Sequence, residues 1–153
     1  MAMINVTLPD GTVNEYAAGI TCAEVISDAL GKKNGCLAAL VDGQEKDMSH
    51  EIHQSCKVEG IKAESDAGMY ILRHSTAHLL AQAVTELYPD AKPTIGPAID
   101  RGFYYDFAME PITEADLKPI QKKMQELARR NFTVERIELD LSLIHISEPT
   151  RRT

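Results

Sequence analysis

The apolar pattern of this chain changes its period once, and that change most restricts what the chain can fold into. Up to residue 62, short segments alternate apolar and polar residues, which is typical of half-buried strands. From Gly68 to Tyr88, apolar residues recur at helical spacing. Residues 63–67 are polar and follow neither pattern. We therefore predict a first unit at residues 1–62, a linker at 63–67 and a second unit at 68–140.

The first unit is predicted to contain strands joined by tight turns. Pro9-Asp10-Gly11 combines a residue that presets φ with one that accepts positive φ, so it favours a hairpin turn. Asp42-Gly43 is a second hairpin signal. The alternating segments predict strands at residues 4–8, 12–16, 37–41 and 56–62.

One helix is predicted among these strands. Thr21, followed three residues later by Glu24, is the pattern of a capping box at a helix start. Gly31 is typical of the residue that follows a helix end. The apolar stripe of this helix consists of Cys22, Val25, Ile26, Ala29 and Leu30. A single helix laid across a mixed sheet is an α+β arrangement, and this is the fold class that we predict.

The second unit is predicted to alternate helices and short strands. The expected elements are a helix at 68–88, two strands within 92–109, a helix at about 113–130 and a strand at 132–140. Pro119 lies inside the second helix and lacks an N–H, so this helix is expected to start later than Thr113 or to kink. The apolar positions of the two helices are Met69, Leu72, Leu79, Leu80, Ala83, Val84, Leu87, Leu117, Ile120, Met124 and Leu127.

The composition is that of an ordinary globular chain. Of the 153 residues, 44% are hydrophobic and 25% are charged, which excludes a disordered tail and a collagen-like fibre. No apolar run approaches the roughly 18 residues that a membrane helix needs, so no membrane contact is expected. The start of the chain lacks the basic and apolar regions of a signal peptide. Three cysteines without a Cys-x-x-Cys pattern predict neither a disulfide framework nor a zinc site, so the expected location is a reducing cytoplasm.

The net charge of −7 argues against a generally basic surface for nucleic acids. Any contact with RNA would need a local patch of positive charge. Five cations gather on the second predicted helix, namely Lys118, Lys122, Lys123, Arg129 and Arg130. They form either an RNA-facing patch or an ordinary solvated face.

His74 and His78 are the strongest candidates for chemistry. Residues four apart on a helix share a face, so the two imidazoles are predicted to be neighbours. Such a pair can bind a metal, orient a water molecule or share acid–base work. His50 and His53 lie in the other unit, so no third metal ligand is evident and no metal site is certain. The alternative interpretation is a pair of surface or core histidines without a chemical role.

A second group of candidates follows within residues 95–106. The bend at Gly96 and Pro97 could lie against a ligand, and Tyr105 with Asp106 could stack a base and bind a hydroxyl group. A simple turn and a half-buried strand are the alternatives. The sequence contains no Gly-rich phosphate loop and no Ser/His/Asp arrangement.

These motifs, in this order, resemble those of one enzyme family. Arg73-His-Ser-Thr-Ala-His-Leu-Leu80, Ile95-Gly-Pro97 and Gly102-Phe-Tyr-Tyr-Asp106 are similar in content and separation to the start of the editing domain of bacterial-type threonyl-tRNA synthetases. Residues 3–62, with Leu8-Pro-Asp-Gly11 at the first turn, resemble the TGS domain, a ubiquitin-like β-grasp module. The resemblance extends from residue 3 to about residue 140.

The resemblance implies an enzyme that joins threonine to tRNA(Thr). It implies ATP, Mg²⁺ and Zn²⁺ in a catalytic domain that is absent from this chain, and no cofactor in the chain itself. A homodimer is expected only through that absent domain.

The resemblance also implies that the second unit hydrolyses serine wrongly attached to the tRNA. His74 and His78 match the histidine pair of the family's editing site, and Tyr105 matches a position near the terminal adenosine. Gly96, Pro97 and Asp106 are expected to bind the same substrate. The Cys-x-x-x-His half of that site is absent from this sequence, so neither activity is expected of the chain by itself.

Residues 141–153 are similar to the translated read-through of a transposon-type sequencing-library adapter, so they and His145 are given no role. Two other functions stay open. One is a TGS-type interaction module of a regulatory or GTPase-like protein, although the sequence has no P-loop. The other is a free-standing trans-editing hydrolase with a His-x-x-x-His pattern.

Overall fold

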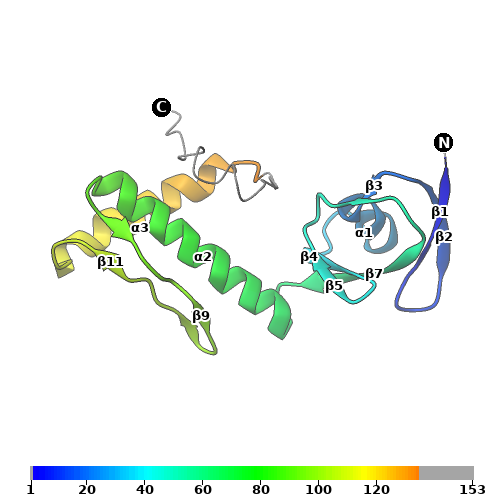
Figure 1. Ribbon diagram of the computed structural model, residues 1–153, viewed down its shortest axis with the longest axis horizontal. Coiled ribbons are helices and arrows are strands. Elements are labelled where there is room, and N and C mark those ends of the chain that lie inside the picture. The colour runs from blue at the N-terminus through cyan, green and yellow to red at the C-terminus, as the bar shows by residue number, and fades with distance from the viewer. Residues whose placement is uncertain (1, 135–153) are drawn as a thin grey trace, which may run out of the picture.

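The chain forms two units that follow one another along the long axis of the molecule (Figure 1). The structure is a computed structural model that describes residues 2–134. The adapter-like tail, His145 and most of the strand predicted at 132–140 fall on residues 135–153 and so lie outside the described residues. Within the described range, no helix combines the length and the apolar character needed to cross a bilayer.

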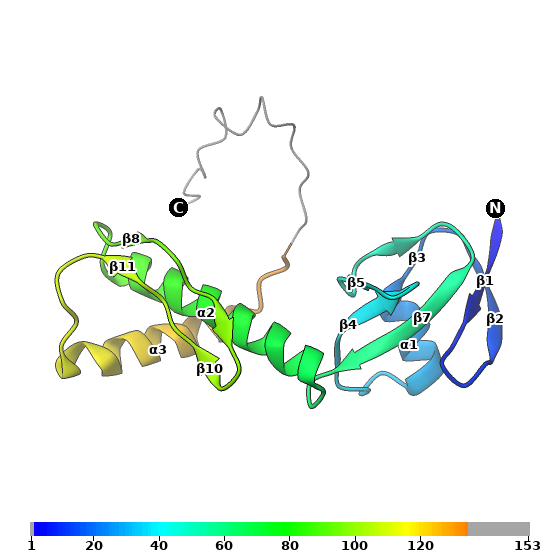
Figure 2. The same ribbon diagram turned by 60° about the horizontal axis from the view of Figure 1, so that its bottom comes forward.

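The first unit is built on a five-stranded sheet in the order β2-β1-β7-β4-β5. Its strands are β1 (Met3–Thr7), β2 (Val13–Ala17), β4 (Cys36–Val41), β5 (Gln44–Lys46) and β7 (Cys56–Lys62). The central strand β7 is parallel to β1, and every other pair in this sheet is antiparallel. The short strands β3 (Ile20–Thr21) and β6 (Glu51–Ile52) pair separately. Figure 2 shows α1 (Cys22–Leu30) crossing one face of the sheet, which confirms the predicted α+β class.

The capping box predicted for α1 is confirmed. The Thr21 hydroxyl accepts a hydrogen bond from the Glu24 amide (3.3 Å), and the Glu24 carboxylate accepts one from the Thr21 amide (2.9 Å). The buried part of the predicted stripe is shorter than expected, because Ala29 and Leu30 are exposed. These two residues border an open hollow beside Pro9 instead of packing on the sheet. The core of the first unit consists of Ile4, Val6, Cys22, Val25, Ile26, Ala39, Ile52 and Val58.

The helix α2 (Asp66–Leu87) begins two residues before the predicted start, so the connection between the units is shorter than the linker predicted at 63–67. Ser65 caps this helix, because its hydroxyl accepts a hydrogen bond from the Gly68 amide (3.1 Å). A side chain at Gly68 would overlap the carbonyl oxygen of Lys62 at the end of β7. The glycine therefore allows α2 to start directly against the first unit.

The predicted apolar positions of α2 are confirmed in part: Ala83 and Val84 are buried, and Leu79 and Leu80 are half-buried. The buried positions of this helix also include Ala77 and Ala81. The exposed fraction of Leu72 is 45%, and Met69 and Leu87 are also exposed. The elements that pack on α2 cover its alanine-rich side, and small side chains there let them approach the helix backbone closely.

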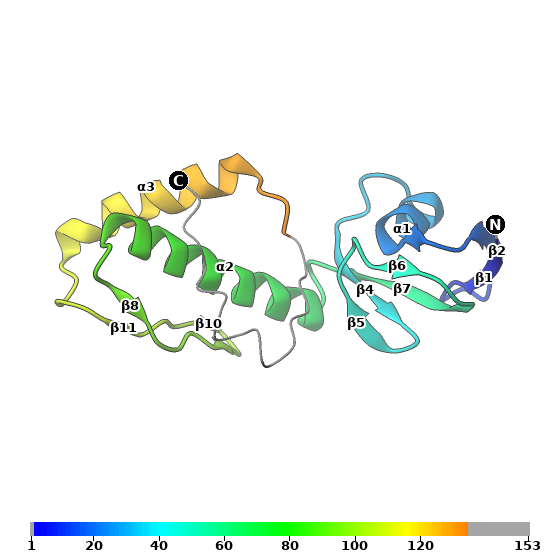
Figure 3. The ribbon, with the colours of Figure 1, turned by 45° about the horizontal axis from the view of Figure 1, so that its top comes forward.

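A long, bent hairpin follows α2 and lies along it in Figure 3. Each of its two arms, predicted as one strand, is broken into two short strands. In the outer half of the hairpin β9 (Ala98–Ile99) pairs with β10 (Gly102–Phe103), and near its base β8 (Lys92–Pro93) pairs with β11 (Phe107–Ala108). Pro93 and Pro97 lack the N–H that a continuous ladder needs, which accounts for the interruption.

The helix α3 (Glu114–Arg130) runs beside α2 (Figure 3). Thr113 is the N-cap and Glu114 is the first helical residue, so the helix starts where Thr113 indicates and the alternative of a later start is wrong. Pro119 lies inside the helix. The Asp116 carboxylate accepts hydrogen bonds from the amide (2.8 Å) and the hydroxyl (2.7 Å) of Thr113, which fixes this start. Of the predicted apolar face, Ile120 and Leu127 are buried, Met124 is half-buried and Leu117 is exposed.

Candidate functional site

The two predicted catalytic histidines lie side by side on α2. Nε2 of His74 is 3.0 Å from Nε2 of His78, and the ring centroids are 4.6 Å apart at an interplanar angle of 76°. A hydrogen bond between two imidazole nitrogens needs one donor and one acceptor, so the rings cannot both be protonated at Nε2 while it persists. Both side chains are exposed. The pair is therefore available to a substrate.

Tyr70 extends this pair by one further turn. Its ring lies nearly parallel to that of His74, with an interplanar angle of 14° and a centroid distance of 6.4 Å. We did not predict this contact from the sequence, although the spacing of four residues between Tyr70 and His74 is the same signal that identified the histidine pair.

The hairpin reaches the same end of α2. A guanidinium nitrogen of Arg73, Nη1, donates a hydrogen bond to the carbonyl oxygen of Ile99 (3.3 Å). A hollow of about 300 Å³ opens at this contact, between the start of α2 and the end of β9. It is lined by Asp66, Met69, Tyr70, Arg73, Ala98, Ile99 and Asp100. Tyr70 thus faces the hollow and also neighbours the histidine pair.

The other predicted substrate-binding residues gather within the hairpin. A Cβ at Gly96 would overlap the ring of Tyr105, so the tyrosine packs directly on the glycine backbone. The ring of Tyr105 also stacks on Phe107, with centroids 4.9 Å apart. The main chain of Asp106 links the two arms, because its N–H donates to Ile95 (2.8 Å) and its carbonyl accepts from Thr94 (2.9 Å).

The predicted site residues therefore form two clusters. Among the residues that the structure describes, no hydrogen bond or aromatic contact joins either imidazole to Tyr105. The histidines contact each other and Tyr70, whereas Gly96, Tyr105 and Asp106 hold the hairpin together. Pro97 is half-buried beside Gly96. The sequence correctly placed the histidines on one helix face, but their distance from the tyrosine depends on the path of the hairpin.

Two of the five predicted RNA-binding cations are engaged in ion pairs. Nζ of Lys123 lies 2.9 Å from a carboxylate oxygen of Glu86 on α2, and Arg130 pairs with Glu126 on α3. The hydrogen bond to Glu86 raises the pKa of Lys123, and the one from Arg130 lowers the pKa of Glu126. Lys118, Lys122 and Arg129 are exposed.

Among the residues that the structure describes, neither a metal cluster nor an activated thiol accompanies the histidine pair. In residues 2–134, no group of three histidine, cysteine or acidic side chains could hold a metal ion. Cys22, Cys36 and Cys56 all belong to the first unit, where burial raises the pKa of their thiols. A thiol with a raised pKa is a poor nucleophile at neutral pH.

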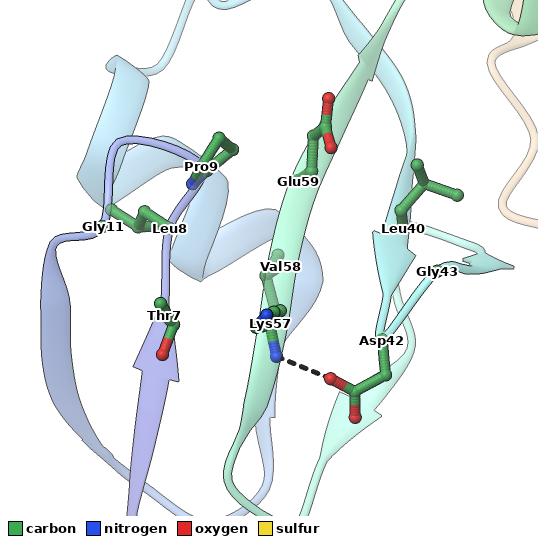
Figure 4. A pocket seen from close by; sticks show the side chains of 10 residues that line it. All are labelled: Thr7, Leu8, Pro9, Gly11, Leu40, Asp42, Gly43, Lys57, Val58 and Glu59. Carbon is green, nitrogen blue, oxygen red and sulfur yellow. Dashed lines mark hydrogen bonds between the residues drawn. The ribbon is translucent and has the colours of Figure 1, made fainter.

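A separate hollow of about 360 Å³ lies in the first unit, where β1 and β4 end and β7 begins (Figure 4). None of the predicted site residues lines it. An Asp42 carboxylate oxygen accepts a hydrogen bond from the Lys57 amide (2.8 Å), so this acid stabilises the β4–β5 turn against β7. The Asp42 carboxylate in this hollow therefore has a structural role in the turn.

Comparison with known proteins agrees with this architecture. The family model of the TGS domain matches residues 4–62. Residues 4–62 are a TGS domain. This result confirms the β-grasp fold expected of the first unit, with its single helix on a mixed sheet.

The similarity continues beyond the TGS domain. Over 134 residues, or 86% of this chain, the sequence is 48% identical to a threonine–tRNA ligase of Alkalilimnicola ehrlichii. Over 136 residues, it is also 48% identical to a threonine–tRNA ligase of Francisella tularensis subsp. tularensis. The matched part is 21% of each relative, so the chain spans about a fifth of their length and corresponds to their N-terminal part. The predicted resemblance is thereby confirmed.

Proposed function

We propose that this chain is the N-terminal region of a threonine–tRNA ligase, and that its second unit supplies two histidines to the hydrolysis of mischarged Ser-tRNA(Thr). The observation that carries this proposal is the imidazole pair with its Nε2 atoms 3.0 Å apart, within a sequence that matches such ligases at 48% identity. Tyr105, Gly96, Pro97 and Asp106 are proposed to bind the end of the same tRNA. Neither activity is expected of the 153-residue chain in isolation.

A ligase for threonine needs a second site because of the chemistry of its substrate. Serine lacks only one methyl group of threonine, and such a group is worth about 1–3 kcal/mol in a pocket. Binding alone therefore rejects serine too weakly. A separate site that hydrolyses the serine ester restores accuracy without demanding more of the synthetic site.

The histidine pair fits the proton transfers of ester hydrolysis. The reaction needs a water molecule that loses a proton as it attacks the ester carbon, and a proton for the departing ribose oxygen. The 3.0 Å between the two Nε2 atoms suits a hydrogen bond in which one ring accepts and the other donates. The accepting ring can take the proton of the attacking water once the substrate separates the rings, and it then becomes an imidazolium. This imidazolium can give the same proton to the departing ribose oxygen, while the N–H of the donating ring holds the attacking water in place. The rigid α2 holds both rings on one face for this task.

The remaining parts of the proposal concern the whole ligase. ATP, Mg²⁺ and Zn²⁺ would serve the synthetic reaction in a catalytic portion beyond this chain, and a homodimer would form through that portion. The partner is tRNA(Thr), and the proposed location is the cytoplasm. The described residues contain no group of three possible metal ligands, and the proposed hydrolysis is written with the two imidazoles alone.

The test is deacylation of Ser-tRNA(Thr) by the complete ligase that carries this N-terminal region. His74→Ala and His78→Ala should each lower the rate by roughly a hundredfold or more, which is typical of losing a general acid or base. His53→Ala is the matched control, because His53 is exposed and contacts only Glu51 among the described charged groups. Wild-type rates in both α2 variants would contradict the proposed role.

An interaction module of a regulatory protein is the competing function. That interpretation uses only the TGS domain, which ends at residue 62. The identity to threonine–tRNA ligases extends over 86% of the chain and therefore includes most of the second unit. This extent favours the ligase over a TGS module in another setting.

A further inference from the structure

The exposed side of α3 carries a narrow row of cations. Lys118, Lys122 and Arg129 are separated by four and seven residues, and Gln125 lies between the last two. On an α-helix these spacings place all four side chains on one face. We call these four residues the α3 stripe. The buried residues Ile120 and Leu127 occupy the opposite side of the helix, so the stripe points away from the packed interior.

Two of the carboxylates near the stripe, Glu86 and Glu126, are neutralised by other cations. A third, Glu114, lies four residues before Lys118 on the same face, so one acid borders the N-terminal end of the stripe. Glu126 borders the same surface, but it pairs with Arg130 and lies 3.6 Å from Lys123. Glu86 also pairs with Lys123 (2.9 Å). The negative charges of Glu86 and Glu126 are thus balanced by the positive charges of Lys123 and Arg130. None of the ion pairs within residues 2–134 includes a member of the stripe. The stripe therefore presents three positive charges in a chain whose net charge is −7.

A hollow and an aromatic ring mark the C-terminal end of the stripe. Lys122, Gln125 and Arg129 line an open depression of about 380 Å³, together with Glu126 and Arg130. Just beyond it, Phe132 is 61% exposed, and the guanidinium of Arg130 lies 5.9 Å from its ring centroid. An exposed ring beside a basic groove is the combination that stacks an unpaired base while cations hold the backbone.

We propose that the α3 stripe binds the phosphate backbone of the tRNA, and that Lys123 and Arg130 serve the fold instead. This inference rests on the proposed tRNA substrate and divides the five cations of α3 by role. From Lys118 to Arg129 the stripe is roughly 16 Å long at 1.5 Å per residue, which is enough to follow several phosphates of one strand. A regular polyanion fits three cations in a straight row better than the irregular charges of a protein surface do.

The expected signature is the salt dependence of binding. Each phosphate contact contributes about 0.7–0.9 to the slope of log K against log salt concentration. Three contacts therefore account for a roughly 20–40-fold change in affinity between 50 and 200 mM salt. The affinity of the full chain for a tRNA(Thr) transcript is measured over this range by fluorescence anisotropy.

Two neighbouring lysines give a matched comparison. Lys122→Met should lower the slope by about 0.7–0.9, and the triple change of Lys118, Lys122 and Arg129 to neutral residues should lower it by about three times as much. The control is Lys123→Met combined with Glu86→Gln, which removes an ion pair without changing the net charge. It should keep the salt slope of the wild type and lose thermal stability.

The outcomes separate this inference from the proposed function. An unchanged slope in the triple variant, or an equal loss in the control, would overturn the role of the stripe even if the complete ligase deacylates Ser-tRNA(Thr) through its histidines. Conversely, a lower slope in the triple variant would support the stripe even if the histidine variants keep full deacylation. Two further results would also overturn it. One is failure of the wild-type chain to bind tRNA at 50 mM salt. The other is a triple variant that loses affinity for an acidic peptide but keeps its affinity for the tRNA.

Discussion

At the scale of single residues, the second unit depends on two glycines that leave no room for a side chain. A Cβ at Gly96 would overlap the ring of Tyr105, and one at Gly68 would overlap the carbonyl oxygen of Lys62. The two obstacles differ in kind. Tyr105 is a side chain that can turn, whereas the Lys62 carbonyl belongs to the backbone at the end of β7. Gly68 is therefore the stricter requirement.

Gly68→Ala is expected to destabilise the chain, against the usual trend for a helix. Alanine normally stabilises a helical position by about 0.5–1 kcal/mol relative to glycine. Here the overlap with a backbone oxygen adds a cost of roughly 1–3 kcal/mol, typical of overpacking. Thermal unfolding should show a net loss of about 1–2 kcal/mol. Ala67→Gly, at the neighbouring exposed position, gives the propensity effect alone, and a gain of stability in Gly68→Ala would refute the close contact.

The residue patterns that were predictable are the local ones. Thr21 with Glu24 and the Asp42-Gly43 turn each lie within a few residues, and both form as expected, with positive φ at Asp42 (49°) and Gly43 (79°). The closeness of His74 and His78 follows from helix geometry in the same way. The packing of Tyr105 on Gly96 joins the two arms of a bent hairpin, and no local spacing specifies it.

At the scale of elements, α2 and α3 are held together by polar contacts at one end. The Tyr88 hydroxyl donates a hydrogen bond to the Asp116 carboxylate (2.7 Å), and the same carboxylate caps α3 through Thr113. The hydrogen bonds from Thr113 and Tyr88 lower the pKa of Asp116 to about 2. One carboxylate thus starts α3 and fastens it to the end of α2.

This carboxylate predicts a specific pH dependence of stability. Because the folded-state pKa of Asp116 is about 2 and its ordinary value is 3.8, its contribution is complete above pH 4 and is lost as the pH falls towards 2. Asp116→Asn should therefore remove part of the acid sensitivity of unfolding, as measured by circular dichroism between pH 2 and pH 6. Asp90→Asn, at an exposed position just after α2, is the control. Identical acid profiles for wild type and Asp116→Asn would contradict the assignment.

Elements that are defined by the apolar pattern of their own residues were predicted well. Elements that form through contacts with distant parts of the chain were not. The strand β7 occupies Cys56–Lys62 as expected, because alternation and flanking residues define it. The pairing of β3 with β6 joins residues about thirty apart, and the sequence does not show it. On α2, Ala83 and Val84 are buried as predicted, but Leu72 is exposed and Ala81 is buried, because the covering elements and not the hydrophobicity of the residue decide which positions are enclosed.

At the scale of the whole molecule, the two units differ in how much core they contain. The TGS domain has eight buried residues in one cluster, whereas the cluster of the second unit has three, Val84, Ala91 and Ile120. Several large apolar side chains of the second unit stay exposed, among them Leu72, Ile95, Leu117 and Phe132. The chain spans about a fifth of the ligases that it matches. The first unit is therefore the better packed of the two within residues 2–134.

The most direct measurement of the central claim is the amount of Ser-tRNA(Thr) that accumulates when the complete ligase is given serine, ATP and tRNA(Thr). The wild-type enzyme should accumulate little Ser-tRNA(Thr), because under our proposal the site containing His74 and His78 hydrolyses it. His74→Ala should accumulate it while charging threonine at the wild-type rate. Equal, low accumulation in the two enzymes, or loss of threonine charging in the variant, would contradict a hydrolytic role for the histidine pair.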